Sequence, residues 1–188
     1  VQAGTGTATF TGNVGNNTNA TELEALTITN AAATTFSGTL DLAGALTQTN
    51  AATGTTTFSG AVSVGSAALK GTDYALDNSF ASGGTTAFIN SGTVTKNAGT
   101  NITSTGAFST TGDVNLAANI TTTDTDLTIG GNLVIAEAAA PTLSTGAGTA
   151  GNILVTGTTN GTAGGVAESL TVQAGTGTAT FTGNVGNN

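Results

Sequence analysis

Residues 34–38 read Thr-Thr-Phe-Ser-Gly, and the same five residues recur at 56–60, an offset of 22. A longer stretch before each copy also repeats: residues 25–32, Ala-Leu-Thr-Ile-Thr-Asn-Ala-Ala, match residues 45–52 at seven of eight positions with an offset of 20. The change of offset indicates a two-residue insertion around residues 53–55. Short copies that differ by small insertions are typical of a solenoid, in which each repeat is one structural unit.

Within the copies, apolar residues alternate with polar ones. The alternating pairs include Ala8/Phe10, Leu26/Ile28, Leu40/Leu42, Val62/Val64, Val114/Leu116, Leu127/Ile129 and Ile153/Val155. A period of two is the pattern of a strand with one buried face. Thr, Val, Ile and Phe favour strands, and we expect Thr at outward positions and Gly and Asn at positive-φ corners. The sequence therefore predicts an all-β fold, a parallel β-solenoid or β-helix with two or three short strands in each coil.

A second repeat has a much longer period. Residues 1–17, VQAGTGTATFTGNVGNN, recur without a change as residues 172–188, an offset of 171. Divided into coils of 20–22 residues, 171 residues give about eight coils. We expect residues 1–171 to form one tandem-repeat unit, a single continuous β-solenoid, and residues 172–188 to start the next identical unit. The alternative is a duplicated end within one finite protein.

Some segments resemble the copies less closely. Phe10-Thr-Gly-Asn-Val14 and residues 108–116 are weaker versions of the Phe-Ser-Gly segment. Residues 21–26 begin with a capping box, Thr21 with Glu24, and we expect a helical turn there. For residues 67–84, we expect a larger loop or side decoration.

Composition limits the chemistry of the chain. Five types, Thr, Ala, Gly, Asn and Ser, supply 133 of the 188 residues, and Arg, His, Cys, Met and Trp are absent. We therefore expect no catalytic residues, no enzyme activity and no bound cofactor. The formal net charge of -8 opposes binding to nucleic acid, and no apolar run is long enough to span a membrane. The chain starts at Val1 with no secretory signal pattern, so we expect either that a leader was removed or that this is an internal segment.

Two carboxylates are the candidate metal ligands. Asp124 and Asp126 share one face if residues 122–127 are extended, and carboxylates together with backbone carbonyls are the ligands that calcium prefers. The alternative is a polar corner with two solvated acids. The glycine- and aspartate-rich nonapeptide of calcium-binding β-rolls is absent.

The two lysines suggest a spontaneous Lys–Asn isopeptide bond with a carboxyl catalyst. Lys70 has Asp73 and Asp77 nearby in the sequence, and Lys96 is followed by Asn97. The alternative for both is an ordinary solvated lysine.

Threonine pairs suggest a surface array. Thr-x-Thr pairs occur at 7/9, 27/29, 47/49, 93/95 and 103/105. If such pairs stacked on one flat face, they would form a regular array of hydroxyl and methyl groups suited to binding ice or carbohydrate. Otherwise they fill outward strand positions, where a branched side chain is favourable.

The Phe-Ser-Gly units, the alternation, the composition rich in Thr, Gly, Asn and Ala and the long repeat together resemble those of very large bacterial surface proteins with β-strand repeats. These are similar in style to the solenoids of filamentous haemagglutinin and autotransporter passengers. The resemblance implies export, a parallel β-solenoid, and a role in attachment, coats or fibres. We therefore expect an extracellular or cell-surface structural module whose partners are further copies of itself, head-to-tail or covalently continuous, and a cell or host surface.

Overall fold

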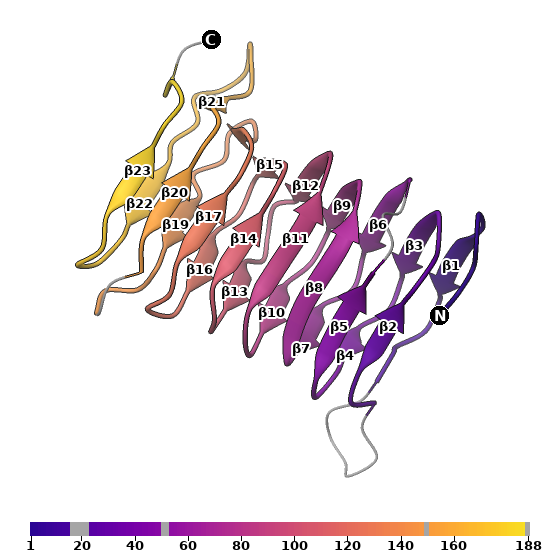
Figure 1. Cartoon of the computed structure of the whole chain (residues 1–188). Helices are drawn as coiled ribbons and strands as arrows, with labels where there is room; N and C mark the ends of the chain where they lie inside the picture. Colours follow the sequence, from indigo (N-terminus) through magenta and orange to yellow (C-terminus); the bar gives the residue numbers. More distant parts are fainter. Residues whose placement is uncertain (16–22, 50–52, 149–150, 187–188) are drawn as a thin grey trace.

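The computed structural model describes residues 1–15, 23–49, 53–148 and 151–186. In these ranges the regular structure consists of 23 strands and no helix. The strands stack into three parallel sheets that run along a rod, with the two chain ends at opposite ends of it (Figure 1). The predicted all-β parallel solenoid is thus confirmed.

The chain passes through the three sheets in a fixed order, which we number accordingly. The first sheet contains β1 (Thr7–Phe10), β3 (Ala33–Phe36), β6 (Thr55–Phe58), β9 (Asp73–Leu76), β12 (Thr93–Lys96), β15 (Asp113–Leu116), β18 (Leu133–Ile135) and β21 (Thr159–Gly161). The second contains β4 (Leu40–Asp41), β7 (Val62–Val64), β10 (Phe80–Ser82), β13 (Ile102–Ser104), β16 (Ile120–Thr122), β19 (Thr142–Ser144) and β22 (Thr171–Gln173). The third contains β2 (Leu26–Ile28), β5 (Ala45–Gln48), β8 (Ser66–Gly71), β11 (Thr86–Asn90), β14 (Phe108–Thr110), β17 (Leu127–Ile129), β20 (Ile153–Val155) and β23 (Ala179–Phe181).

One strand from each sheet makes one coil, and the eight-stranded first and third sheets define eight coils. The sequence repeats correspond to stacked residues: Leu26 pairs with Leu46, and Thr34 with Thr56. Both predicted offsets are therefore the spacing between residues in neighbouring coils. Coil length varies more than the repeats suggest, because Thr55 pairs with Asp73, whereas Ser144 pairs with Gln173.

Two local predictions are wrong. Residues 67–84 form no loop or decoration but lie in β8, β9 and β10, with Tyr74 and Leu76 buried like the inward residues of neighbouring coils. Their charged residues Lys70 and Asp73 occupy outward or half-buried positions, so they do not interrupt the strands. The helical turn predicted at 21–26 has its Thr21 outside the described residues, and Leu26 begins β2.

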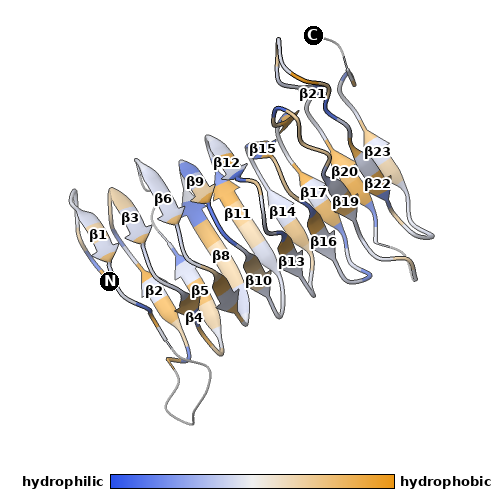
Figure 2. Cartoon of the chain, turned by 180° about the vertical axis from the view of Figure 1, so that it is seen from behind, coloured by the Kyte–Doolittle hydropathy of each residue, from blue (hydrophilic) through white to orange (hydrophobic). Residues whose placement is uncertain are grey.

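The core is a continuous column of inward side chains from all three sheets. Hydrophobic residues recur in strand after strand from one end of the rod to the other (Figure 2). Aromatic rings link successive coils: Phe10, Phe36 and Phe58 stack face to face at centroid distances of 4.7 and 5.1 Å. Offset or edge-on contacts then continue through Phe80, Phe88 and Phe108. Ring contacts of this kind add to the stability gained by burying apolar area.

Threonine is not confined to outward positions as we expected. The fully or almost fully buried threonines are Thr34, Thr56, Thr86, Thr110, Thr122, Thr145 and Thr159. Several inward hydroxyls at strand ends donate to turn carbonyls: Thr110 Oγ1 to Gly112 O at 3.2 Å, and Ser104 Oγ to Gly84 O at 2.7 Å. A buried hydroxyl that satisfies a buried carbonyl is tolerated in a core, and this allows threonine to face inward near the corners.

Tyr74 is the one tyrosine of the chain, and its hydroxyl is buried without a hydrogen-bond partner. Burial raises the pKa of this phenol above its usual value. Because a buried hydroxyl without a partner costs roughly 1–3 kcal/mol, we expect Tyr74→Phe to raise the free energy of unfolding by about 1 kcal/mol in urea titrations. A loss of stability in this variant would contradict the expectation. Tyr74→Leu, which empties part of the site, serves as the destabilised control.

Candidate functional site

The most regular polar feature of the solenoid is a set of side-chain ladders at its corners. Asp113 Oδ1 accepts a hydrogen bond from the backbone N–H of Asn132 at 2.7 Å, and Asn132 Oδ1 accepts from the N–H of Thr158 at 2.9 Å. The same contact joins Asn13 to Thr39, Asp73 to Thr93, Asn101 to Asn119, Asn119 to Thr142, Asp126 to Asn152 and Asn152 to Thr178. Each ladder satisfies a corner N–H that the sheets leave unpaired.

The ladders correct our interpretation of the asparagines. Among the described residues, the positive φ angles belong to seven glycines, Asp124 and Ala138, and to no asparagine. Asparagine is therefore used for its side-chain oxygen rather than for a left-handed backbone. The signal for this role is present in the sequence as Asn or Asp near the same point of successive copies, but it becomes interpretable only once the coils are aligned.

We expect Asn132→Ala to lower the free energy of unfolding by about 1–2 kcal/mol, because the N–H and the Oγ1 of Thr158 both lose their acceptor. The matched control is Asn115→Ala, since the Oδ1 of Asn115 has no hydrogen-bond partner. Thermal unfolding of both variants measures the difference. Equal losses would contradict a role for the corner ladder.

The two candidate calcium ligands lie at one corner before β17, and both side chains are exposed. Asp126 Oδ1 is a ladder acceptor, bound to the backbone N–H of Asn152 at 2.8 Å and to its Nδ2 at 3.3 Å. Asp124 has a φ of 54°, and its backbone N–H donates to Thr145 O at 2.8 Å. Within the described ranges, no three or more His, Cys, Asp or Glu side chains gather where they could hold a metal ion.

Lys96 occupies an inward position of β12, between Leu76 and Leu116 of the neighbouring coils, and is only 1% exposed. Its Nζ donates to the backbone oxygens of Asn97 at 2.8 Å and of Leu76 at 3.2 Å. The Asn97 side chain donates instead to Asp77 Oδ1 at 2.7 Å. The hydrogen bonds of the amine thus go to main-chain carbonyls, while the amide proposed for an isopeptide bond is held by a carboxylate.

The other members of the isopeptide hypothesis are also engaged in coil-to-coil contacts. Lys70 lies at an exposed position of β8. Asp73 Oδ1 accepts the backbone N–H of Thr93, and Asp77 accepts from Ser59 Oγ at 3.3 Å as well as from Asn97. These contacts assign both carboxylates a structural use.

Burial lowers the pKa of the Lys96 amine below its usual value, and the nearby Asp77 carboxylate opposes this shift. Because the unfolded chain then binds more protons than the folded one, stability should rise with pH between the lowered pKa and the unfolded value of about 10.4. Replacing a buried charge by an apolar side chain of similar volume is often stabilising, and we expect Lys96→Met to add about 1 kcal/mol at pH 7. The gain should shrink toward pH 10. Lys70→Met is the exposed control, and a destabilised Lys96→Met would contradict the prediction.

The Thr-x-Thr pairs are distributed over all three faces of the rod. Pairs 7/9 and 93/95 lie on the first sheet, 27/29 and 47/49 at the third, and 103/105 at the second. The longest outward threonine ladder joins Thr9, Thr35 and Thr57, and the next residue in that register is Ala75. An array for ice or carbohydrate would therefore span three coils of one face.

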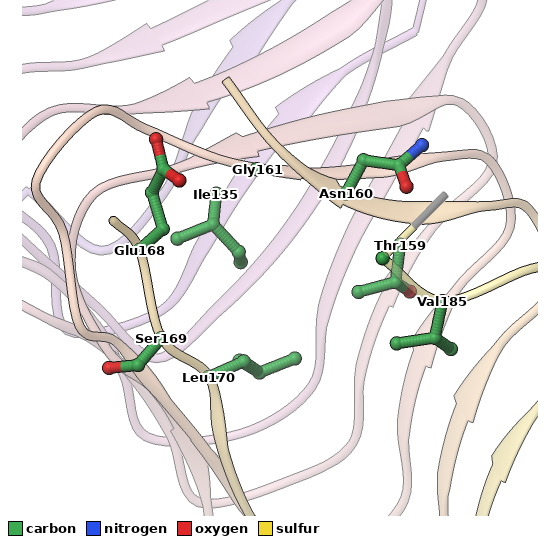
Figure 3. Close-up of a pocket in the computed structure, with 9 residues that line it drawn as sticks. Ile135, Thr159, Asn160, Gly161, Glu168, Ser169, Leu170 and Val185 are labelled. Carbon is green, nitrogen blue, oxygen red and sulfur yellow. The ribbon is translucent and has the colours of Figure 1, made fainter. Parts of the chain in front are cut away.

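A cavity of about 150 Å³ lies at the last coil, lined by Ile135, Thr159, Asn160, Gly161, Glu168, Ser169, Leu170, Val185 and Gly186. In Figure 3, Leu170 and Ile135 approach it from one side and Val185 from the other. Glu168 Oε1 is buried there without a hydrogen-bond partner. The sequence gave no indication of this site, because residues 162–170 belong to no recognisable copy of the coil.

No helix long and apolar enough to cross a membrane occurs in the part of the chain that the structure describes. The chain matches no known protein family, and no characterised protein or solved structure is significantly similar to it.

Proposed function

We propose that the chain is a non-catalytic structural module of an extracellular fibre, sheath or long surface adhesin, in the style of the bacterial β-strand-repeat surface proteins. The observation that carries the proposal is the identical pair of segments, 1–17 and 172–188, whose described parts both stack as coils of one solenoid. A unit whose beginning also fits onto its own end can be repeated along an axis without a change of architecture.

The mechanism of such a module is mechanical. Parallel sheets, corner ladders and the aromatic column all connect each coil to its neighbours, so stiffness and reach increase with the number of coils. The surface is rich in Thr and Asn and carries few cations, with two lysines against ten acids. Such a surface limits nonspecific binding to anionic polymers and membranes.

The mass of the native polypeptide under denaturing conditions tests the proposal. A mass several times 17.8 kDa, with peptides of the 171-residue unit in multiple copies, is expected for a covalent array. Surface labelling of intact cells should reach the polypeptide, and negative-stain images should show thin rods. A native mass near 17.8 kDa together with a globular, intracellular protein would overturn it.

The alternative, binding of ice through threonine arrays, rests on the ladder Thr9, Thr35 and Thr57. Thermal hysteresis at the freezing point distinguishes it from a purely structural role. Hysteresis that is abolished in Thr35→Lys and retained in Thr128→Lys, an outward change on the third sheet, would favour ice binding over the fibre proposal.

A further inference from the structure

The two copies of the 17-residue segment have the same local shape. Gly4 and Gly175 adopt φ angles of 62° and 57°, and Gly15 and Gly186 adopt 75° and 68°. The intervening turn is also shared: the N–H of Gly6 donates to Ala3 O at 2.9 Å, and that of Gly177 to Ala174 O at 2.8 Å. Ala8 and Phe10 occupy the same inward register as Ala179 and Phe181. The segment thus carries its own turns and its own inward face.

The two copies nevertheless lie on different sheets. Residues 7–10 form β1 of the first sheet, whereas the corresponding 179–181 form β23 of the third. Val14 pairs with Leu40 of the second sheet, but its copy Val185 pairs with Thr159 of the first.

The beginning of the segment shows the same displacement. Gln2 pairs with Asn30, which follows β2 of the third sheet, and its copy Gln173 lies in β22 of the second. Every element of the second copy is therefore displaced by one face in the same direction. From β1 to β23 the chain advances seven coils and two further faces, so 171 residues do not complete a whole number of coils.

A second motif shows that a change of face is compatible with this fold. The Phe-Ser-Gly segments at 36–40 and 58–62 lead from the first sheet to the second. The related segment at 108–114 leads from the third sheet to the first, as 181–185 does. The same strand–corner–strand unit is therefore used at two different edges of the triangular coil.

Two glycines of the first copy gain a reason only from the second. An ideal Cβ on Gly12 meets no atom within 4 Å, and one on Gly6 meets only Ala3 O of its own turn, at 3.2 Å. On the copies, that Cβ would lie 2.3 Å from Gly157 O for Gly183 and 2.2 Å from Gly151 O for Gly177. Glycine at these positions is what a segment needs when a preceding coil lies beneath it.

We infer that successive 171-residue units are related by a screw of one third of a turn, so that each unit presents its faces one position round from the unit before. The inference rests on the proposed repeat-array function. The occupant of the open edge of β21, β22 and β23 is then residues 29–41 of the next unit, because residues 1–15, which have the same sequence, already carry those residues. With coils about 4.8 Å apart, one unit rises by about 37 Å, and the faces realign after three units.

The first test uses the 188-residue chain, which has no cysteine of its own. Leu154 and Thr180 are outward partners in neighbouring strands, close enough for a disulfide. We expect Leu154→Cys with Thr180→Cys to cross-link under mild oxidation. The control is Asn160→Cys with Thr180→Cys, because Asn160 lies on the first sheet, where the second copy would stack if it kept the face of the first. Cross-linking of the control pair instead would overturn the displacement.

The second test uses a chain of two units, residues 1–171 followed by residues 1–188. Thr180 with the Thr35 of the second unit, both changed to cysteine, should cross-link within one chain, as the pairing of Thr9 with Thr35 requires. Images of longer arrays should show a rotation of one third of a turn, apart from solenoid twist, for each rise of about 37 Å. No rotation with a rise of eight whole coils would overturn the inference.

The two proposals fail separately. If the native polypeptide proves to be a single unit while the Leu154–Thr180 pair cross-links, the fibre function fails and the displacement of the second copy stands. If native arrays exist but the cross-link and the rotation are absent, the screw fails and the fibre function stands.

Discussion

Replacing Gly60 by alanine should destabilise the solenoid by at least about 3 kcal/mol, near the upper end of what overpacking costs. An ideal Cβ on Gly60 would lie 2.1 Å from the carbonyl oxygen of Gly38 and 2.4 Å from its carbonyl carbon. These are backbone atoms of the preceding coil, and the neighbouring N–H of Ser59 is bonded to Phe36 O at 2.9 Å. The coils therefore have to separate at this corner, and the adjacent hydrogen bonds weaken with them.

The matched control for this prediction is Gly12→Ala at the same corner of the first coil, where the added Cβ meets nothing within 4 Å. We expect a change within about 0.5 kcal/mol there. Urea unfolding of both variants, followed by circular dichroism, measures the difference. Equal stability of the two variants would show that the contact between Gly60 and Gly38 does not set the corner.

Phe88→Ala should cost about 3–5 kcal/mol, the range for removing a large buried side chain. Phe88 is 1% exposed and joins the aromatic column by contacts with Tyr74 at 5.0 Å, Phe80 at 5.6 Å and Phe108 at 6.0 Å between ring centroids. Its removal leaves a cavity in the middle of the rod, with coils on both sides that cannot collapse into it without breaking their register.

The control is Ile89→Ala, the next residue of β11, whose side chain points outward and is 48% exposed. We expect a loss below about 1 kcal/mol for this variant. In a solenoid each coil contacts only its neighbours, so hydrogen exchange in Phe88→Ala should accelerate most in β8, β11 and β14. Uniform acceleration along the rod would contradict a local effect.

Much of the architecture was predictable because the fold repeats its own neighbours. The matches of residues 25–32 with 45–52 and of 34–38 with 56–60 were already the register of stacked strands, as Leu26–Leu46 and Phe36–Phe58 show. A parallel, in-register stack places like residues above like residues, so the offset between copies is the length of a coil.

The polar sites were less predictable, because their roles depend on contacts between coils. Lys96 lies at an inward position of a strand that places Val94 inward as well, yet a lone lysine read from the sequence is an ordinary solvated one. Asp126 was a candidate metal ligand and is a corner acceptor for Asn152. The cavity beside Leu170 and Val185 is formed by segments that are far apart in the sequence.

The sequence by itself determined the period, the inward and outward alternation and the presence of a second copy 171 residues on, because each is a local pattern that the backbone must follow. Only the tertiary structure decided which face each copy occupies. Residues 1–17 and 172–188 are identical, so nothing within them distinguishes the first sheet from the third. The face is set by the number of coils that the intervening chain completes, and that number depends on where every strand pairs with the coil before it.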